Sequence, residues 1–354
     1  MKSAVAGLVA LLLIISLLPM MRREAWWIRV FDFPRLQILA LSLVAGALAI
    51  AYWGLGTWSG AAVVGAAFLP VLIQATSIRP YTGFARQEVL AATEPEPAST
   101  VSLLVANVLM RNRRADRLLS LIAEYQPDVV LLLEPDGWWA ARMHVLEEEG
   151  YAHVLKEPLD NRYGMLLYSR LPLLESRIVH LLREEIPSMH ARVRLRGGDE
   201  VWLHALHPEP PSPTEADTSV PRDVELLLVG REVKGRDAPT IVAGDLNDVA
   251  WSYTTTLFQR VSGLLDPRKG RGMFNTFNAK IPLVRWPLDH VFHSDHFALV
   301  DLQRLPAFGS DHFPVYVRLA LRPAVAAVQQ EPRANQADRA AARAKLAQAA
   351  REER

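Results

Sequence analysis

The sequence predicts about three transmembrane helices followed by an α/β domain, built as a sandwich of two sheets covered by helices. Half of the 354 residues are hydrophobic, which is high for a purely water-soluble protein. The excess lies in the first 78 residues, where long uncharged runs predict a membrane domain. From residue 100 onward, short strand-type runs alternate with amphipathic stretches, and the strands outnumber the helices.

Three uncharged apolar runs fill region 1–78, at Ser3–Met21, Leu36–Trp53 and Trp58–Ile78. Each is about as long as a helix that crosses the hydrocarbon core. For the first run the alternative is a cleavable signal peptide, but Pro19-Met-Met-Arg-Arg offers no small-residue cleavage site, which favours a retained anchor. For the other two the alternative is a buried hairpin of a soluble domain, which is disfavoured because Ala, Gly and Leu leave no polar face.

Segment 79–99 turns polar and ends in Thr93-Glu-Pro-Glu-Pro-Ala-Ser, which is typical of an extended linker. A globular domain is therefore expected over 100–321. Residues 322–354 are rich in Ala, Gln, Arg and Glu and contain no aromatic residue, so they predict a tail that is disordered or a lone helix.

Hydrophobic periodicity assigns the elements of the globular domain in order. Helices are expected over 113–125, 138–149 and 222–234. Strands are expected over 101–106, 129–133, 164–169, 188–196, 200–206, 240–243, 288–293, 297–302 and 315–319.

Charge and cysteine content exclude several functional classes. The chain has no cysteine, which excludes disulfides and thiolate metal ligands. A net charge of +1 provides no broad positive field for binding duplex DNA, which weakly disfavours that partner, although a local groove could still be basic. No basic, aromatic-interleaved segment is recognised near the motifs described below, so nucleic acid is the less favoured partner.

Polar side chains follow the predicted strands where each apolar run gives way to a loop. They are Asn107, Glu134, His207, Asp245 with Asn247, and Asp311 with His312. Each has a structural alternative, such as an Asx turn at Asp245 or a capping or ion-pairing role for Glu134. Their accumulation at strand ends instead favours one site on one rim of the sandwich. Carboxylate and amide oxygens suit Mg²⁺, and the set predicts phosphate-ester hydrolysis.

Histidines complete this set, and the tetrapeptide SDHF occurs twice, at 294–297 and 310–313. The histidines near strand ends are His204, His207, His290, His293, His296 and His312. No spacing among them is a helical His-x-x-x-His or HExxH pattern, so zinc is not the expected metal.

The motifs that contain these residues, and their order along the chain, resemble those of the endonuclease/exonuclease/phosphatase superfamily, which has the DNase I-like fold. The matching stretches are VANVL with Asn107, LLLEP with Glu134, HALHPEPP with His207, GDLND with Asp245, LDHVF with Asp289, and SDHFPV with Asp311 and His312. The resemblance covers about Val101–Leu321, and GDLN followed by SDHFPV is its most specific pair. It implies a four-layer sandwich of two mixed β-sheets flanked by helices.

The resemblance also implies a Mg²⁺-dependent site, with Mn²⁺ as an alternative ion. The implied metal ligands are Glu134, Asn107 and Asp311. The implied phosphate-binding residues are Asn247, Asn107 and His207. The implied catalytic residues are Asp245, which orients the attacking water, His312, Asp289 and His207.

The second SDHF copy fits the family pattern, because Asp289 precedes Asp311 by the expected interval and would hold the His312 imidazole in one tautomer. The first copy, Asp295 with His296, is expected to be a solvated loop. Three roles stay open for His312: general base, general acid or charged phosphate ligand.

The three-span N-terminal region resembles the bacterial membrane-bound members of the superfamily. By that analogy the protein is a membrane-anchored phosphohydrolase of the bacterial inner membrane that acts on a lipid-borne phosphate, such as a phospholipid or polyprenyl pyrophosphate. One alternative is a DNase I-like endonuclease that acts on nucleic acid, and another is a catalytically silent membrane scaffold. Membrane lipids are expected partners, and no obligate protein partner is indicated.

Two observations disagree on which side of the membrane the domain lies. Arg22, Arg23, Arg29 and Arg35 follow the first span, and the positive-inside rule then places the domain in the cytoplasm. The resemblance and Lys2 before the first span favour the opposite side. The interpretation leans slightly to an extracytoplasmic domain.

Overall fold

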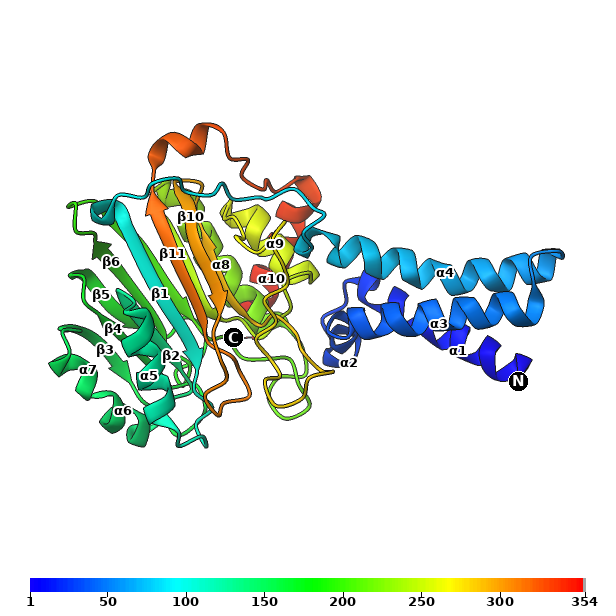
Figure 1. Ribbon diagram of the computed structural model, residues 1–354, viewed down its shortest axis with the longest axis horizontal. Helices are drawn as coiled ribbons and strands as arrows, with labels where there is room; N and C mark the ends of the chain where they lie inside the picture. The colour runs from blue at the N-terminus through cyan, green and yellow to red at the C-terminus, as the bar shows by residue number, and fades with distance from the viewer. Residues whose placement is uncertain (353–354) are drawn as a thin grey trace.

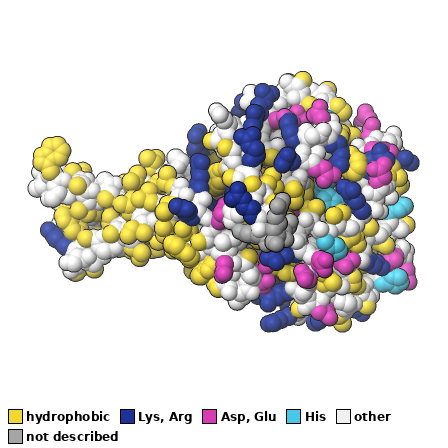
Figure 2. All heavy atoms as spheres, turned by 180° about the vertical axis from the view of Figure 1, so that it is seen from behind, with side chains coloured by type: hydrophobic (Ala, Val, Ile, Leu, Met, Phe, Trp, Pro, Cys, Tyr) yellow, Lys and Arg dark blue, Asp and Glu magenta, His cyan; other side chains and the backbone are white. Residues whose placement is uncertain are grey.

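Three apolar helices form a bundle that projects from a globular α/β domain (Figure 1). The helices are α1 (Lys2–Leu17), α3 (Arg35–Trp53) and α4 (Trp58–Ile78). The computed structural model describes residues 1–352. With their flanking turns the three helices are long and apolar enough to cross a membrane. Figure 2 shows a mostly apolar bundle surface beside a globular surface of mixed charge, as expected if lipid surrounds the bundle.

Buried polar side chains connect the three helices inside the bundle. Arg35 Nη1 donates to Gln74 Oε1 at 2.9 Å, and Gln74 Nε2 donates to Ser16 Oγ at 2.9 Å. The Ser16 hydroxyl donates to the Leu12 carbonyl oxygen at 2.6 Å. Because polar groups in an apolar environment need partners, this chain fixes how α1, α3 and α4 lie against one another.

Two mixed β-sheets pack face to face in the globular domain, which confirms the predicted fold class. The first sheet has the order β10 (Phe297–Arg304), β11 (Val315–Leu321), β1 (Thr100–Asn107), β2 (Val129–Leu133), β4 (Met165–Ser169) and β3 (His153–Glu157). The second has the order β5 (Leu173–Val179), β6 (Ser188–Arg194), β7 (Glu200–Leu206), β8 (Thr240–Asp245) and β9 (Asp289–His293).

The alternation of side chains along the strands separates three apolar layers. Leu103 and Val105 of β1 point between the sheets, where they meet Leu203 of β7. Their neighbours Leu104 and Ala106 point outward, against the helices α5 (Ala115–Tyr125), α6 (Gly137–Met143) and α7 (Val145–Glu148). The outer face of the second sheet is covered by α8 (Val220–Arg236) and α9 (Tyr253–Ser262). Strands buried on both faces explain the continuous apolar runs in the sequence.

Several elements differ from the sequence-based expectation. The helix expected over 138–149 is two short helices, α6 and α7. The strands β3 and β5 are additional, because edge strands that are half exposed have a weak apolar pattern. The helix α9 is additional too. A short helix, α2 (Trp26–Arg29), also lies between the first two spans.

The segment expected to be a linker packs for much of its length. Val89 is fully buried in the core between the sheets. Ala92 N–H donates to the Leu299 carbonyl oxygen at 2.7 Å, and Leu299 N–H donates to the Leu90 carbonyl oxygen at 2.8 Å. Residues 89–92 therefore cover the edge strand β10, while other parts of the segment, such as Phe84 and residues 96–98, are exposed.

The C-terminal segment is neither disordered nor a lone helix over its described part. It forms α10 (Gln336–Glu352), which packs against α8 and α9. Ala342 is buried against Leu227 and Leu257. Lys345 Nζ donates to Glu24 Oε1 at 2.6 Å and to Asp223 Oδ2 at 2.9 Å. Composition concealed this packing because alanine buries little area and the lysine depends on distant carboxylates.

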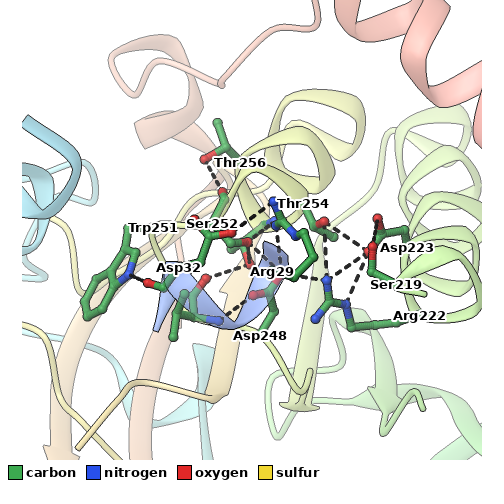
Figure 3. A network of polar contacts seen from close by, with 12 residues as sticks. Arg29, Asp32, Ser219, Arg222, Asp223, Asp248, Trp251, Ser252, Thr254 and Thr256 are labelled. Atoms are coloured by element: carbon green, nitrogen blue, oxygen red, sulfur yellow. Dashed lines mark hydrogen bonds and ion pairs between the residues drawn. The ribbon is translucent and has the colours of Figure 1, made fainter. Parts of the chain in front are cut away.

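A network of buried ion pairs joins the loop after α1 to the globular domain (Figure 3). Arg29 lies 2.9 Å from Asp32 and 3.8 Å from Asp248, and Arg222 lies 2.9 Å from Asp248. Trp251 Nε1 donates to the Asp32 carbonyl oxygen at 2.7 Å. Burial raises the pKa of Asp248, while Arg222 and Arg29 oppose that rise. We call this set, Arg29, Asp32, Arg222, Asp248 and Trp251, the buried clamp.

The buried clamp predicts that Arg29→Gln destabilises the whole protein. Removing one partner leaves the Asp32 and Asp248 carboxylates buried with less opposing charge, which costs roughly 3 kcal/mol of unfolding free energy. Thermal unfolding of the full-length protein in detergent should show a clearly lower midpoint. Arg23→Gln, an exposed arginine of the same loop, is the matched control and should unfold like the wild type. Equal midpoints for both variants would contradict the clamp.

Candidate active site

Strand pairing brings the predicted site residues to one rim of the sandwich. Asn107 ends β1 opposite Leu133 of the parallel strand β2, so Glu134 follows beside it. Asp245 ends β8 opposite Asp289, the first residue of β9. The carboxyl ends of parallel strands lie at one edge of a sheet, and the two sheets face each other there.

The backbone is unusual at the ends of β2 and β8. Glu134 and Asn247 have positive φ angles of 62° and 51°. Gly244, with a φ of 149°, lies so close to β7 that an added Cβ would stand 1.9 Å from the Leu206 carbonyl oxygen. Only glycine fits there, and the close approach brings Asp245 next to the end of β7. Left-handed non-glycine residues are more frequent at functional sites.

Asn107 connects the carboxylates of the two sheets. Its Nδ2 donates to Glu134 Oε1 at 2.8 Å and to Asp245 Oδ2 at 3.1 Å. Its Oδ1 accepts from Leu109 N–H at 3.0 Å, which fixes the orientation of the amide. The side chain therefore bridges the sheets with both polar atoms engaged.

His312 contacts two carboxylates. Its Nδ1 lies 2.8 Å from Asp289 Oδ2, and its Nε2 lies 3.6 Å from Asp245 Oδ2. Burial opposes a charge on the ring, but Asp289 and then Asp245 more than offset this and raise the pKa of His312 to about 10. The imidazole is therefore positively charged at neutral pH.

His207 approaches the same Asp245 oxygen as His312 does. Its Nε2 is 4.0 Å from Asp245 Oδ2, and its ring packs against Tyr163 with centroids 5.6 Å apart. Burial lowers the pKa of His207, although Asp245 opposes this. Its buried Nδ1 has no hydrogen-bond partner within the described chain, so the ring has capacity for a further contact.

The remaining predicted residues lie at the same rim. Asn247 N–H donates to Asp245 Oδ1 at 2.9 Å, and Asn247 Nδ2 donates to the Pro208 carbonyl oxygen at 3.0 Å. The Asp245–Asn247 contact is the Asx turn that was the structural alternative for this pair, so turn and site coincide. Asp311 directly precedes His312, and its charge contributes to the electrostatics of Glu134.

Three supporting residues have no clear signal in the sequence. Ser310 Oγ donates to the Asn107 carbonyl oxygen at 2.8 Å and accepts from His312 N–H at 3.0 Å. Thr276 Oγ1 accepts from Asp289 N–H at 3.1 Å. Phe277 packs on the His312 ring with centroids 5.0 Å apart. Ser310 belongs to the second SDHF, but the role of its hydroxyl depends on a distant strand.

The first SDHF copy lies outside this rim. His296 Nδ1 contacts Ser294 Oγ at 3.0 Å, and no contact to the residues above is observed in the described chain. A second polar group, His190 and His204 of the second sheet with Glu232 of α8, also brings three ligand-type atoms together. Arg236 contacts both Glu232 and His204 there, and its positive charge opposes a metal ion.

A local group of basic residues lies beside the rim. Four arginines, Arg111, Arg113, Arg114 and Arg117, follow Asn107 within ten residues. They belong to a loop and the first turn of α5 and, as expected from the sequence, are not interleaved with aromatic residues. The rim is therefore acidic at its centre and basic at one side.

A model of the Endonuclease/Exonuclease/phosphatase family matches residues 104–312, more than half of the chain. The chain belongs to this family. The match includes Glu134, His207, Asp245, Asp289 and His312, and it identifies the chain as a hydrolase of phosphate esters.

Solved structures share the fold at low sequence identity. An endonuclease/exonuclease/phosphatase from Beutenbergia cavernae has a TM-score of 0.51 and 20% identity, and covers 63% of this chain and 72% of its own. The human nocturnin catalytic domain with bound sulfate has a TM-score of 0.52 and 18% identity, covering 67% and 97%. D. rerio TDP2 with a single-strand DNA product has a TM-score of 0.50 and 23% identity, covering 62% and 99%. A search of curated proteins finds no match.

Family enzymes generally use divalent metal ions, and the acidic part of the rim fits such an ion. Burial raises the pKa of Glu134 to about 7, with Asp245 and Asp311 adding to the rise. The Asn107 amide and His312 only partly offset this cost. A carboxylate that is so costly to ionise, surrounded by other oxygen ligands, is what a hard cation stabilises.

The rim geometry predicts that Asp289→Asn lowers kcat by about 100-fold or more with little change in KM, because the His312 ring loses its charged partner. Without that carboxylate the pKa of His312 falls, so the alkaline limb of the pH–rate profile should move to lower pH. The measurement is hydrolysis of bis(4-nitrophenyl) phosphate by full-length protein in the presence of a divalent metal ion. Asp295→Asn, beside the first SDHF histidine, is the control, and equal losses in both variants would contradict the assignment.

Proposed function

We propose that the protein is a membrane-anchored, Mg²⁺-dependent phosphohydrolase that acts on a lipid-borne phosphate ester. The observation that carries the proposal is the Asn107, Glu134, Asp245 and His312 cluster, held at the rim of a domain that packs on an apolar bundle. Glu134, Asn107 and Asp311 would hold the ion, and Mn²⁺ would suit the same oxygens. The bound ion would neutralise charge on the phosphoryl oxygens.

Asp245 is proposed to orient the attacking water. Its Oδ2 accepts from Asn107, while His312 Nε2 stands 3.6 Å away and His207 Nε2 stands 4.0 Å away. Both separations exceed a direct hydrogen bond and suit a bridging water or a substrate oxygen. A water that donates to Asp245 would face a phosphoryl group lying between the two histidines.

The charge of His312 favours one of its three open roles. With a pKa of about 10, it donates a proton or a hydrogen bond far more readily than it accepts a proton. We therefore assign His312 to stabilisation of the phosphoryl oxyanion, with Asp289 as the positioning residue. His207 and Asn247 would contact the remaining phosphoryl oxygens.

The loop between β8 and β9 supports a lipid-borne substrate. Gln37 Nε2, in the first turns of α3, donates to the Leu283 carbonyl oxygen at 2.7 Å, which sets the loop at the level where this span begins. Leu283 is 82% exposed and Ile281 is 50% exposed. Exposed aliphatic side chains beside the start of a membrane span are suited to the lipid interface.

The same loop leads back to the catalytic rim. Phe33, before α3, packs edge-on against Trp286, which stacks on Phe277, and Phe277 packs on His312. Ala279 N–H donates to the Asp311 carbonyl oxygen at 2.6 Å. The same loop would therefore contact both the bilayer surface and the site, so a lipid-borne phosphate would lie close to His312.

A nuclease is the second candidate function. It is favoured by the arginines beside the rim and by the fold shared with TDP2, whose structure contains a DNA product. The scaffold alternative is less favoured, because a silent domain has no need for four carboxylates around one asparagine and two histidines.

The proposed function predicts phosphate release from lipid phosphates by the full-length protein with Mg²⁺, and none with EDTA. Asp245→Ala and His312→Ala should each lose at least about 100-fold in rate. His296→Ala, in the other SDHF copy, is the matched control and should retain activity. Cleavage of plasmid DNA alone would favour the nuclease, and loss of activity only in His296→Ala would mean that the wrong copy is assigned. Full-length protein is required because truncation before the globular domain would expose the buried clamp.

The domain is proposed to lie outside the cytoplasm. Of the four loop arginines that favour the cytoplasm, Arg29 and Arg35 are buried in ion pairs with Asp32, so a structural role accounts for them. The charge argument then depends mainly on Arg22 and Arg23.

The absence of cysteine allows a direct test of this orientation. Ser120→Cys on α5 and Ser59→Cys at the opposite end of the bundle each introduce one exposed thiol. In intact spheroplasts, a membrane-impermeant maleimide should label Ser120→Cys and spare Ser59→Cys. Labelling of Ser59→Cys alone would place the domain in the cytoplasm.

A further inference from the structure

A basic pocket opens beside the catalytic rim. It has a volume of about 820 Å³, and it is lined by Arg111, Arg114, Arg117 and Lys280 together with parts of the loop before β11. No carboxylate and no aromatic ring lines it. It is separate from the acidic cluster around Glu134 but adjoins it.

The pocket and the catalytic cluster share a wall. Ser310 lines the pocket, and its hydroxyl donates to the Asn107 carbonyl oxygen and accepts from His312 N–H. Leu109 also lines the pocket, and its N–H donates to Asn107 Oδ1. A ligand bound in the pocket would therefore be separated from the residues around the proposed reacting phosphoryl group only by the shared wall of Ser310 and Leu109.

The cations of the pocket are available for a ligand. Neighbouring arginines are occupied: Arg113 forms two hydrogen bonds with Asp136, and Arg142 pairs with Asp116. By contrast, no ion pair is observed for the side chains of Arg111, Arg114, Arg117 and Lys280 within residues 1–352. Unpaired cations gathered around one hollow favour an anion.

The loop before β11 is shaped to leave this hollow open. Gly309 has a φ of 112°, and a Cβ there would stand 2.7 Å from Arg114 Cδ and from Asn112 Oδ1. Asn112 is buried, and its Oδ1 accepts from Arg114 N–H at 3.2 Å. The backbone therefore holds Arg114 at the pocket wall, and glycine permits the close approach.

We propose that this pocket binds a further phosphoryl group of the substrate, so that the enzyme's substrate class is an organic diphosphate. This inference rests on the proposed phosphohydrolase function of the adjoining rim. Four cations around one open hollow match one additional phosphoryl group with its two or more charged oxygens. A nucleic-acid strand fits less well, because the hollow has no aromatic ring on which bases would stack.

Binding without metal separates the pocket from the catalytic rim. In EDTA the acidic rim repels anions, so calorimetric titration of the full-length protein with inorganic pyrophosphate and with orthophosphate reports on the basic pocket. The wild type is expected to bind pyrophosphate at least about tenfold more tightly than orthophosphate, and Arg111→Gln/Arg114→Gln is expected to lose most of that preference. Lys280→Gln, on a different segment, should weaken pyrophosphate binding in the same direction. Arg177→Gln, an exposed arginine on β5, is the control and should retain wild-type affinity.

Matched lipid probes distinguish a free diphosphate from a lipid-borne one. Farnesyl monophosphate and farnesyl diphosphate in detergent micelles share one tail and differ by one phosphoryl group. Tighter binding of farnesyl diphosphate than of farnesyl monophosphate, dependent on Arg111 and Arg114, would support the inference. If farnesyl diphosphate also binds more tightly than inorganic pyrophosphate, the source of the diphosphate is a lipid. Wild-type pyrophosphate affinity in the double variant would overturn the inference, as would tighter, arginine-dependent binding of a twelve-residue oligothymidylate.

The two proposals fail in different ways. If metal-dependent hydrolysis is absent but the arginine-dependent diphosphate preference is present, the proposed function is wrong and the pocket stands as an anion site. If hydrolysis depends on Asp245 and His312 while the double variant binds pyrophosphate like the wild type, the function stands and the pocket inference is overturned.

Discussion

The register of two facing mixed sheets is the constraint on which the site depends. β1 and β2 run parallel in one sheet, and β7 and β8 run parallel in the other, so four strands end at the same rim. Pairing of β1 with β2 brings the Asn107 amide within hydrogen-bond distance of Glu134, and face-to-face packing of the sheets brings it within hydrogen-bond distance of Asp245. A one-residue slip in β1 would direct Asn107 away from both carboxylates, because side chains alternate between faces.

Gathering several carboxylates at one rim has an electrostatic cost. Four carboxylates gather at the ends of strands in a largely buried region, and burial raises the pKa of Glu134 and of Asp245. Packing of the sheets compensates for this cost, and His312 is held charged by two of these carboxylates. A divalent cation would stabilise the ionised carboxylates, and a phosphoryl group would pair with the positively charged arginines beside them.

The apolar helix bundle and the globular domain are joined by buried contacts. The buried clamp joins the loop after α1 to Asp248, and Arg222 Nη1 donates to the Asn247 carbonyl oxygen at 2.8 Å. Lys345 of α10 reaches the same region through Asp223. The loop that carries Asp245 and Asn247 is thus supported by three distant segments. Because buried charges tolerate little displacement, these contacts fix how the rim is oriented relative to the three apolar helices.

The sequence by itself determined the apolar spans, the two-sheet sandwich and the residues that gather at its rim. These follow from local patterns: uncharged runs, strand-type runs and polar residues at strand ends, such as Asn107 and Glu134. It did not determine the half-exposed strands β3 and β5, the packing of α10 or the roles of Ser310 and Thr276, since each depends on partners far away in the chain.

Only the tertiary structure decided that Arg29 belongs to a buried clamp while Arg111 and Arg114 line an open pocket. In the sequence, all three are arginines that lie outside the recognised motifs. The difference is physical: the effect of a charge depends on burial and on the carboxylates that the fold brings to it, and neither is encoded in neighbouring residues.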